Sequence, residues 1–402
     1  MNSRERVLNS VSFKPVDRVP IDLGGMASTS ISAFAHPKLR AYLGLEKHRS
    51  MVYDTGQMLA LPEKDLLDCL GVDVVTANST FTNAFDCSGM FSPFDFNGRL
   101  FASVLNPGQF KVLPDGTILQ GASKMPPSSV VFDGEHGGNP VDYSGELYKI
   151  DLSKIREQIK NYTPDQEALK RKCAFLEKVR NSTDRAVFLN GDSIRLDFVG
   201  GLANGTMLCV LEPEYMHELN KLYTELAIKQ FRETFRYYKD YVDIIMINSN
   251  DMGTQNTTYM HPDLINELFF TYYKELNDYV KSIAPNVKIF LHSCGAIYDL
   301  IDMIANAGFD ILNPVQWTAG GRSYKEWKDR ARKKICLWGG GVDSQHVLPL
   351  GTPEEVYEQA KEVATYMIQD TGFVFCNIHN LLAEISPENI HALYKAAMDV
   401  GK

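Results

Sequence analysis

The sequence predicts an α/β protein and, within that class, a (β/α)8 barrel of the TIM type. Eight short apolar runs rich in β-branched residues recur along the 402 residues, and segments of helical periodicity separate them. Several runs are continuously hydrophobic, which is typical of parallel strands buried on both faces. Eight such strands alternating with helices indicate a barrel. The expected strands are Val19–Gly24, Val72–Ala77, Ala186–Gly191, Val242–Asn248, Val287–Ser293, Phe309–Pro314, Lys334–Gly340 and Phe373–Ile378.

Three of the helical segments have a clear start signal. A capping side chain followed by proline at the first helical position and an acid in the first turn is typical of a helix N-terminus. The expected helices are Leu264–Ile283 after His261-Pro262-Asp263, Val356–Gln369 after Thr352-Pro353-Glu354-Glu355, and Ile390–Val400 after Ser386-Pro387-Glu388-Asn389.

The stretch Phe85–Ser144 does not follow the alternation of strands and helices. It is rich in Gly, Pro, Asp and Phe. We interpret it as an insertion of loops and short antiparallel strands beside the barrel mouth. No internal repeat, low-complexity tract or flexible linker is visible. A single domain over residues 1–402, with an insertion at about 85–144, is therefore expected.

The composition is that of an ordinary globular protein, with 44% hydrophobic and 23% charged residues. A formal charge of −9 argues against a nucleic-acid partner, because no segment supplies a basic face. The uncharged run Phe198–Leu211 is too short and glycine-rich to span a membrane. Seven scattered cysteines are an odd number and favour a reducing compartment over a disulfide framework. We expect a cytoplasmic protein.

Polar residues follow the expected strands, where a barrel places its chemistry. The C-terminal ends of the strands share one mouth, so these side chains should converge there. A helix cap or turn role remains the alternative for any single Asp or Asn, above all for Asp192 and Asp343. The segments are Asp22-Leu23-Gly24-Gly25, Asn190-Gly191-Asp192, Asn248-Ser249-Asn250-Asp251, His292-Ser293-Cys294, Asn313-Pro314, Gly339-Gly340-Gly341-Val342-Asp343 and Cys376-Asn377-Ile378-His379.

The pair His292 and Cys294 points to a metal. Residues two apart on an extended segment face the same side, so the imidazole and the thiolate can converge on one ion. That donor set suits zinc. Buried cysteines and structural histidines are common, which is the competing interpretation. The pair, however, ends an apolar run, precedes Gly295, and is matched by a second cluster at Cys376 and His379.

Several longer motifs resemble the uroporphyrinogen decarboxylase superfamily, and most closely its zinc-dependent, corrinoid-linked methyltransferase branch. The resemblance runs nearly end to end and implies a (β/α)8 barrel. The motifs are Arg4-Glu5-Arg6-Val7-Leu8 with Pro15-Val16-Asp17-Arg18-Val19-Pro20-Ile21-Asp22, Asn250-Asp251-Met252-Gly253-Thr254-Gln255, His292-Ser293-Cys294-Gly295, Gly339-Gly340-Gly341-Val342-Asp343-Ser344-Gln345 and Ser386-Pro387-Glu388-Asn389-Ile390.

The resemblance implies a zinc motif of His-x-Cys followed far downstream by Cys. His292 and Cys294 match its first half, but the downstream position aligns with His379 instead of Cys376. We favour His379 as the third ligand and keep Cys376 as the alternative. Two imidazoles and one thiolate leave Zn2+ with a net positive charge, which makes it a stronger Lewis acid. A methyl ether needs that acid, because its leaving oxygen develops negative charge.

The expected reaction is therefore the transfer of a methyl group from an O-methylated small molecule, such as a phenyl methyl ether, to the cobalt of a corrinoid. No histidine lies in the D-x-H-x-x-G pattern of corrinoid-binding domains, so a partner corrinoid protein should carry that cofactor. We expect the insertion at 85–144 to form part of the docking surface.

The roles of some other residues rest on fewer observations. Asp251 could orient substrate or support the zinc ligands, and Glu384 could be a fourth ligand or a residue that precedes a helix. Tyr259, Tyr298, Trp317 and Trp338 could form an aromatic wall, although a core role is the more ordinary one for each.

Three alternative functions remain. One is methyl transfer from a methylcorrinoid to a thiol or folate. Another is porphyrinogen decarboxylation. It is disfavoured because Asp22–Ser30 contains no arginine, whereas the resemblance implies that true decarboxylases bind the substrate carboxylates with an arginine at this place. A third is a metal-binding accessory role without catalysis.

Overall fold

The computed structural model describes residues 1–77, 88–133, 146–191 and 194–401. These residues form two compact units, each built from several separate chain segments. The first unit comprises Met1–Asp17, Ser144–Gly340 and Tyr366–Val374, and the second comprises Arg18–Tyr143, Gly341–Thr365 and Phe375–Lys402. The segments of the two units alternate along the chain, so this division does not decide how many domains there are. The single domain stays a prediction.

The first unit is organised around a parallel sheet. Its six strands lie in the order β15-β14-β13-β12-β11-β10, so strands that follow one another in sequence are neighbours in space. Most of their residues are fully buried, as the continuous hydrophobic runs predict. The strands are β10 (Ala186–Leu189), β11 (Ile244–Ser249), β12 (Lys288–His292), β13 (Ile311–Asn313), β14 (Cys336–Trp338) and β15 (Phe373–Val374).

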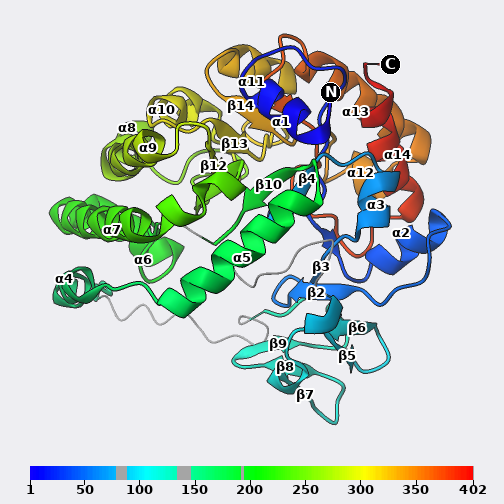
Figure 1. Ribbon diagram of the computed structural model, residues 1–402, viewed down its shortest axis with the longest axis horizontal. Coiled ribbons are helices and arrows are strands. Elements are labelled where there is room, and N and C mark those ends of the chain that lie inside the picture. Colours follow the sequence, from blue (N-terminus) through cyan, green and yellow to red (C-terminus); the bar gives the residue numbers. More distant parts are fainter. Residues whose placement is uncertain (78–87, 134–145, 192–193, 402) are drawn as a thin grey trace. The chain divides into compact units, whose positions relative to one another are not determined.

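Helices connect these strands and flank the sheet, with α7, α9, α10 and α11 outside it in Figure 1. The expected helix Leu264–Ile283 is continuous in the structure but includes one π-helical turn, Asn266–Phe270. The helices are α1 (Ser3–Val11), α4 (Leu152–Asn161), α5 (Gln166–Ser182), α6 (Leu202–Leu211), α7 (Pro213–Thr234), α8 (Pro262–Ile265), α9 (Thr271–Ile283), α10 (Ile301–Asn306) and α11 (Tyr324–Ala331).

Large aromatic rings fill the core against the sheet. Phe188 of β10, Phe290 of β12 and Trp338 of β14 pack edge to face or tilted, with ring centroids 4.7 to 6.0 Å apart. Such contacts add to the free energy gained by burying the rings. Trp338 is therefore a core residue and does not contribute to an aromatic wall for substrate.

The second unit holds one mixed sheet, in which β2 and β6 are parallel, one antiparallel sheet and two of the predicted helices. Its five-stranded sheet has the order β1-β3-β2-β6-β5, and a three-stranded antiparallel sheet has the order β7-β8-β9. Its strands are β1 (Ile31–Ser32), β2 (Met51–Asp54), β3 (Leu59–Ala60), β4 (Val74–Ala77), β5 (Ser92–Asp95), β6 (Phe101–Val104), β7 (Phe110–Val112), β8 (Ile118–Gln120) and β9 (Ser123–Met125), and its helices are α2 (His36–Tyr42), α3 (Lys64–Cys69), α12 (Val347–Leu350), most of α13 (Pro353–Met367) and α14 (Pro387–Asp399).

The expected helices at 356–369 and 390–400 are confirmed as α13 and α14. The described part of the expected insertion, residues 88–133, contains the short strands β5 to β9. Residues 85–87 and 134–144 of that segment lie outside the described part of the chain. That this segment is an insertion beside a barrel mouth stays a prediction.

Seven of the eight predicted strand ranges contain a strand, whereas Val19–Gly24 does not. In that range only Ile21 forms a parallel bridge, to Phe375. Pro20 cannot donate a ladder hydrogen bond, and the Ile21 N–H bonds to the carboxylate of Asp73 at 3.0 Å. Beyond Asp22, Gly24 adopts a positive φ of 83° and turns the chain. The local hydrophobic pattern of this range therefore predicted a longer strand than its backbone forms.

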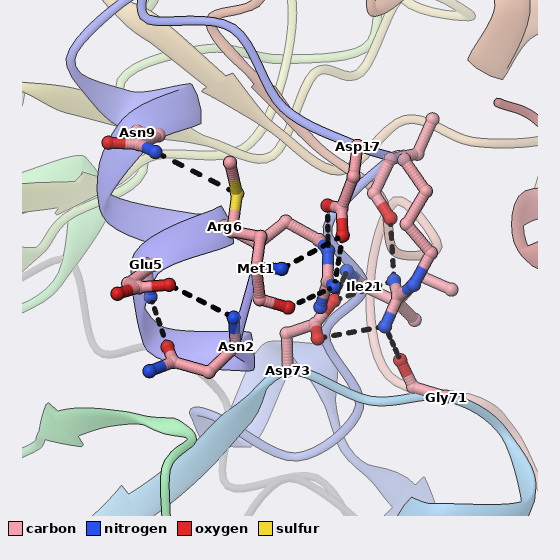
Figure 2. A network of polar contacts seen from close by, with 11 residues as sticks. Met1, Asn2, Glu5, Arg6, Asn9, Asp17, Ile21, Gly71 and Asp73 are labelled. Carbon is pink, nitrogen blue, oxygen red and sulfur yellow. Dashed lines mark hydrogen bonds and ion pairs between the residues drawn. The ribbon is translucent and has the colours of Figure 1, made fainter.

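Polar contacts hold the N-terminal part of helix α1 (Figure 2). Asn2 and Glu5 form a capping box in which each side chain bonds to the other's backbone N–H. Arg6 donates two hydrogen bonds to the carboxylate of Asp17, at 2.7 and 2.8 Å.

Among the described residues, every helix is too short or too polar to traverse a bilayer.

Candidate functional site

His292 ends strand β12 of the first unit, and Cys294 lies two residues beyond it. Both neighbouring strands hold this end in place. The Asn250 N–H, after β11, donates to the His292 carbonyl at 3.1 Å, and the Ser293 N–H donates to the carbonyl of Asn313, in β13, at 2.8 Å. The backbone of the His-x-Cys segment is thus continuous with the sheet and is well positioned before any ligand binds.

The His292 ring has a defined orientation. Its Nδ1 lies 2.6 Å from Oδ1 of Asn313, whose own amide nitrogen donates to the Trp338 carbonyl at 2.9 Å. His292 is 3% exposed and Asn313 is fully buried. Because Oδ1 can only accept, Nδ1 carries the ring proton and the lone pair is on Nε2. Such a partner on the second ring nitrogen is typical of metal-binding histidines.

The Cys294 thiol approaches that lone pair. Its Sγ lies 3.4 Å from Nε2 of His292. Burial raises the pKa of the Cys294 thiol well above its ordinary value, and the nearby Asp251 carboxylate raises this pKa further. A protonated thiol at this distance is a donor to Nε2. A bound cation would take the place of the thiol proton, because thiolate and imidazole are then both ligands.

Asp251 is the acid next to this pair. Its Oδ1 accepts the Cys294 N–H at 2.7 Å and lies 3.8 Å from Nε2 of His292. The carboxylate is half exposed, so it can serve the backbone turn and also face a ligand. Asp251 therefore lies beside the His-x-Cys segment within the first unit, and its predicted roles toward substrate or zinc stay predictions.

Gly295 is needed where the segment turns away from the sheet. Its φ is +97°, and a Cβ at this position would lie 2.2 Å from the Gly253 carbonyl oxygen. Its N–H donates to Oε1 of Gln316 at 2.8 Å. No side chain fits this position without moving the Cys294 turn.

The second predicted cluster belongs to the second unit. Nδ1 of His379 lies 2.6 Å from Oδ1 of Asn380, and the Asn380 amide nitrogen donates to Gln57 Oε1 at 3.4 Å. The same reasoning on acceptors leaves the lone pair of His379 on Nε2. His379 is partly buried. Both histidines are therefore oriented by an asparagine oxygen.

Cys376 and Glu384 differ sharply in their surroundings. Cys376 is fully buried, and burial together with the charge of Asp22 raises the pKa of its thiol well above the ordinary value. Glu384 is exposed and precedes Ser386, the cap of α14. Their predicted roles, as alternative third ligand and as fourth ligand, stay predictions.

The other acids at predicted strand ends form turns. Asp343 accepts the N–H groups of Gln345 and His346, at 2.8 and 3.0 Å, so its turn role is confirmed. Asp22 is buried and accepts the Gly25 N–H at 2.8 Å. Asp192 lies outside the described residues.

Apart from Trp338, the residues of the predicted aromatic wall have different surroundings, and their role toward substrate stays a prediction. Tyr298 packs edge to face on Trp327 and lies beneath Arg322 and Arg330. Trp317 donates from its indole nitrogen to the Gly340 carbonyl at 2.7 Å. Burial raises the pKa of the Tyr259 phenol, and the charges of Asp251 and Cys294 raise it further.

Two contributing residues, Asn313 and Asn380, were given no role toward a metal from the sequence. Asn313 was recognised only as a polar strand end, and its neighbour Pro314 offers no hint of contact with His292. Asn380 follows His379 directly, but asparagine at such a position is equally common in turns. The side-chain contacts became visible only with the fold.

Comparisons with known proteins concern the family and the fold of this chain. A family model for uroporphyrinogen decarboxylase (URO-D) matches residues 199–400. A methyltransferase from Methanosarcina mazei has a similar structure, with a TM-score of 0.52 at 13% identity over 99% of each chain. A psychrophilic glycoside hydrolase family 10 endo-beta-1,4-xylanase matches at a TM-score of 0.30 and 11% identity, over 59% of this chain and 74% of that one. The search of curated proteins gave no match.

Proposed function

We propose that this chain, which belongs to the uroporphyrinogen decarboxylase family, catalyses zinc-dependent methyl transfer. The methyl group moves from an O-methylated small molecule, for instance a phenyl methyl ether, to the cobalt of a partner corrinoid protein. The fold similarity to a methyltransferase from Methanosarcina mazei supports this choice within the family. We further propose that the parallel strands belong to a closed (β/α)8 barrel in a single domain.

One observation carries the proposal. At the end of β12, Nε2 of His292 and Sγ of Cys294 lie 3.4 Å apart, with the ring proton fixed on the opposite nitrogen by Asn313. A histidine oriented in this way is poised to bind a metal rather than to exchange protons through both nitrogens. An imidazole and a thiolate together favour zinc over the harder divalent cations.

His379 is the proposed third ligand, and the three side chains are of types that could hold a metal ion. The support comes from its own surroundings, because the Asn380 oxygen places its lone pair on Nε2, as Asn313 does for His292. Cys376 is a poorer candidate, since its side chain is fully buried next to the negative charge of Asp22.

Zinc held by one thiolate and two imidazoles would supply a net positive charge that withdraws electrons from the ether oxygen. The residues of the chain have separate tasks. Asn313 and Asn380 orient the two rings, and Asp251 holds the turn that carries Cys294. We assign Asp251 and Glu384 as the groups that contact substrate or complete the zinc ligands.

The partner is proposed to bring the corrinoid, because the chain has no histidine in the spacing expected of a corrinoid-binding domain. The segment 85–144 is the proposed part of the docking surface. Methylation of a thiol by a methylcorrinoid is the second candidate, since it would use the same His292 and Cys294 pair.

The decisive test uses the purified chain with free corrinoid. We expect it to methylate cob(I)alamin from a phenyl methyl ether, followed by absorbance, and to lose this activity after zinc chelation. Far-UV circular dichroism should stay unchanged on chelation, because the hydrophobic core does not depend on a metal at its rim. Methylation of a thiol from methylcobalamin without ether cleavage would replace the proposal with the second candidate. Carbon dioxide release from a porphyrinogen would overturn both.

A further inference from the structure

A separate cavity of about 630 Å³ lies in the first unit beyond the end of strand β10. Gly191 and Ile194, which follow β10, line it. Residues of α4 and α7 line it as well, together with Tyr148 and Ile150. Its volume falls within the range of cavities that hold small organic ligands, roughly 300–1,000 Å³.

The charge of this cavity is opposite to that of the whole protein. Among the described residues that line it are Lys154 and Arg195, and none is an Asp or Glu. Neither cation forms an ion pair with a carboxylate in the part of the chain that the structure describes. Asp197 is close enough for its charge to be felt at Arg195, yet it does not line the cavity. Two cations in a protein of net charge −9 favour an anionic ligand.

The backbone next to Arg195 is held firmly. The carbonyl of Leu196 accepts hydrogen bonds from the side-chain amides of Asn248 and Asn250, at 3.4 and 2.8 Å. Both asparagines are buried at the end of strand β11. The backbone that carries the Arg195 side chain is therefore held by the end of the sheet. This lowers the entropy lost when the guanidinium binds a ligand.

The remaining lining is suited to a ring. Ile155, Ile194 and Ala227 are buried and make up an apolar part of the lining, which we call the floor, and Tyr148 and Tyr223 are its aromatic residues. Burial raises the pKa of the Tyr223 phenol, so this group stays a neutral hydrogen-bond donor. Gln158 adds an amide that can bond to either a donor or an acceptor.

We propose that this cavity is a binding site for a small aromatic carboxylate, distinct from the metal centre at His292. The ring lies on the apolar floor between the tyrosines. The carboxylate is bound by Arg195, whose planar guanidinium can donate two parallel hydrogen bonds, with Lys154 adding its charge. This site is independent of the proposed methyl transfer.

Calorimetric titration of the wild-type chain with benzoate tests the proposal, with benzamide and acetate as comparators. We expect saturable benzoate binding with a Kd near or below about 1 mM, and at least about ten-fold weaker binding of benzamide, which lacks the charge, and of acetate, which lacks the ring. Equal affinity for acetate, or no saturable benzoate binding, would overturn the assignment.

Variants locate the bound ligand. Arg195→Gln and Lys154→Gln should weaken benzoate binding, the first by at least about ten-fold. Arg171→Gln, which removes an exposed arginine of α5 outside the cavity, should leave it unchanged. His292→Ala should also bind benzoate normally, and this separates the cavity from the metal centre. Loss of benzoate binding in His292→Ala, or normal binding in Arg195→Gln, would contradict the proposal.

Discussion

His292 and His379 are oriented by the same kind of contact but stand in different surroundings. His292 ends a strand, is almost fully buried, and is bonded to an asparagine that is itself buried and held by the Trp338 carbonyl. His379 is partly buried in an irregular segment, and its asparagine is the next residue in the chain. The first histidine is oriented by a residue of the sheet, whereas the second is oriented by the next residue of an irregular segment.

This difference suggests a division of labour at the proposed metal centre. The His292 and Cys294 pair, here called the rigid side, is held by the sheet. It should set the affinity for zinc, because preorganised ligands lose little entropy on binding. The segment at His379, here called the adjustable side, lies outside the sheet, so we expect it to move more readily and its ligand type to set the charge of the bound zinc. Substitutions on the two sides should therefore fail in different ways.

The largest effect is expected on the rigid side. His292→Ala should reduce zinc affinity and ether demethylation by more than about 100-fold, since it removes a ligand that the sheet holds in place. Elemental analysis after dialysis and the cob(I)alamin assay measure both quantities. His261→Ala, which changes an exposed histidine, is the matched control and should behave as wild type. Full zinc retention in His292→Ala would refute the assignment of this ligand.

Variants on the adjustable side separate ligand identity from charge. His379→Ala should lose most zinc and activity, while Cys376→Ala should retain both. His379→Cys should retain zinc yet cleave ethers more slowly, because a second thiolate neutralises the metal and weakens the Lewis acid. Zinc lost from Cys376→Ala but kept in His379→Ala would reverse the assignment. An unimpaired His379→Cys would remove the argument for ether cleavage.

The orienting asparagines should show a graded effect. Asn313→Ala should lower zinc affinity by about 10- to 100-fold, the range typical of partners behind metal ligands. Asn380→Ala should cost less, because its contact is made within a partly exposed loop. Competition with a chromogenic chelator gives both affinities, and thermal unfolding checks that each variant is folded. Equal losses would contradict the difference between the two sides.

The sequence was sufficient for the rigid side and insufficient for the adjustable one. The apolar run before His292 predicted a buried strand, and the i to i+2 spacing placed imidazole and thiol on one side, as the 3.4 Å contact confirms. The run at Phe373–Ile378 yields only the strand Phe373–Val374, so periodicity could not orient Cys376 and His379. Val19–Gly24 also formed less strand than its pattern predicts, since pairing is confined to the bridge at Ile21 before Gly24 turns the chain.

Gly295 tests how far the rigid side depends on one turn. Gly295→Ala should lower the free energy of unfolding by more than about 2 kcal/mol and weaken zinc binding, because its Cβ meets the Gly253 carbonyl oxygen. Gly321→Ala has a positive φ but open space around it, so it should cost only about 1 kcal/mol and leave zinc binding unchanged. Chemical denaturation measures both. Equal stability losses would show that the close contact has no consequence.

The smallest effect is expected at the contact between Arg6 and Asp17, which should influence stability alone. The Arg6 hydrogen bonds lower the pKa of Asp17 from 3.8 to about 2. A lowered pKa adds stability that is complete above pH 3.8 and is lost as the pH falls through about 2. Asp17→Asn should therefore be slightly less stable than wild type at neutral pH, and the gap should close toward pH 2. A gap independent of pH would contradict this role, and zinc content should not change.

X-ray absorption at the zinc edge of the wild-type protein tests the proposed centre most directly, because it counts sulfur ligands. We expect about one zinc per chain with a single Zn–S distance near 2.3 Å, from Cys294, and imidazole nitrogens near 2.0 Å, from His292 and His379. His379→Cys should raise the sulfur count to two. Two sulfur ligands in the wild type would show that Cys376 is the third ligand, and a protein that binds no zinc would refute the metal centre altogether.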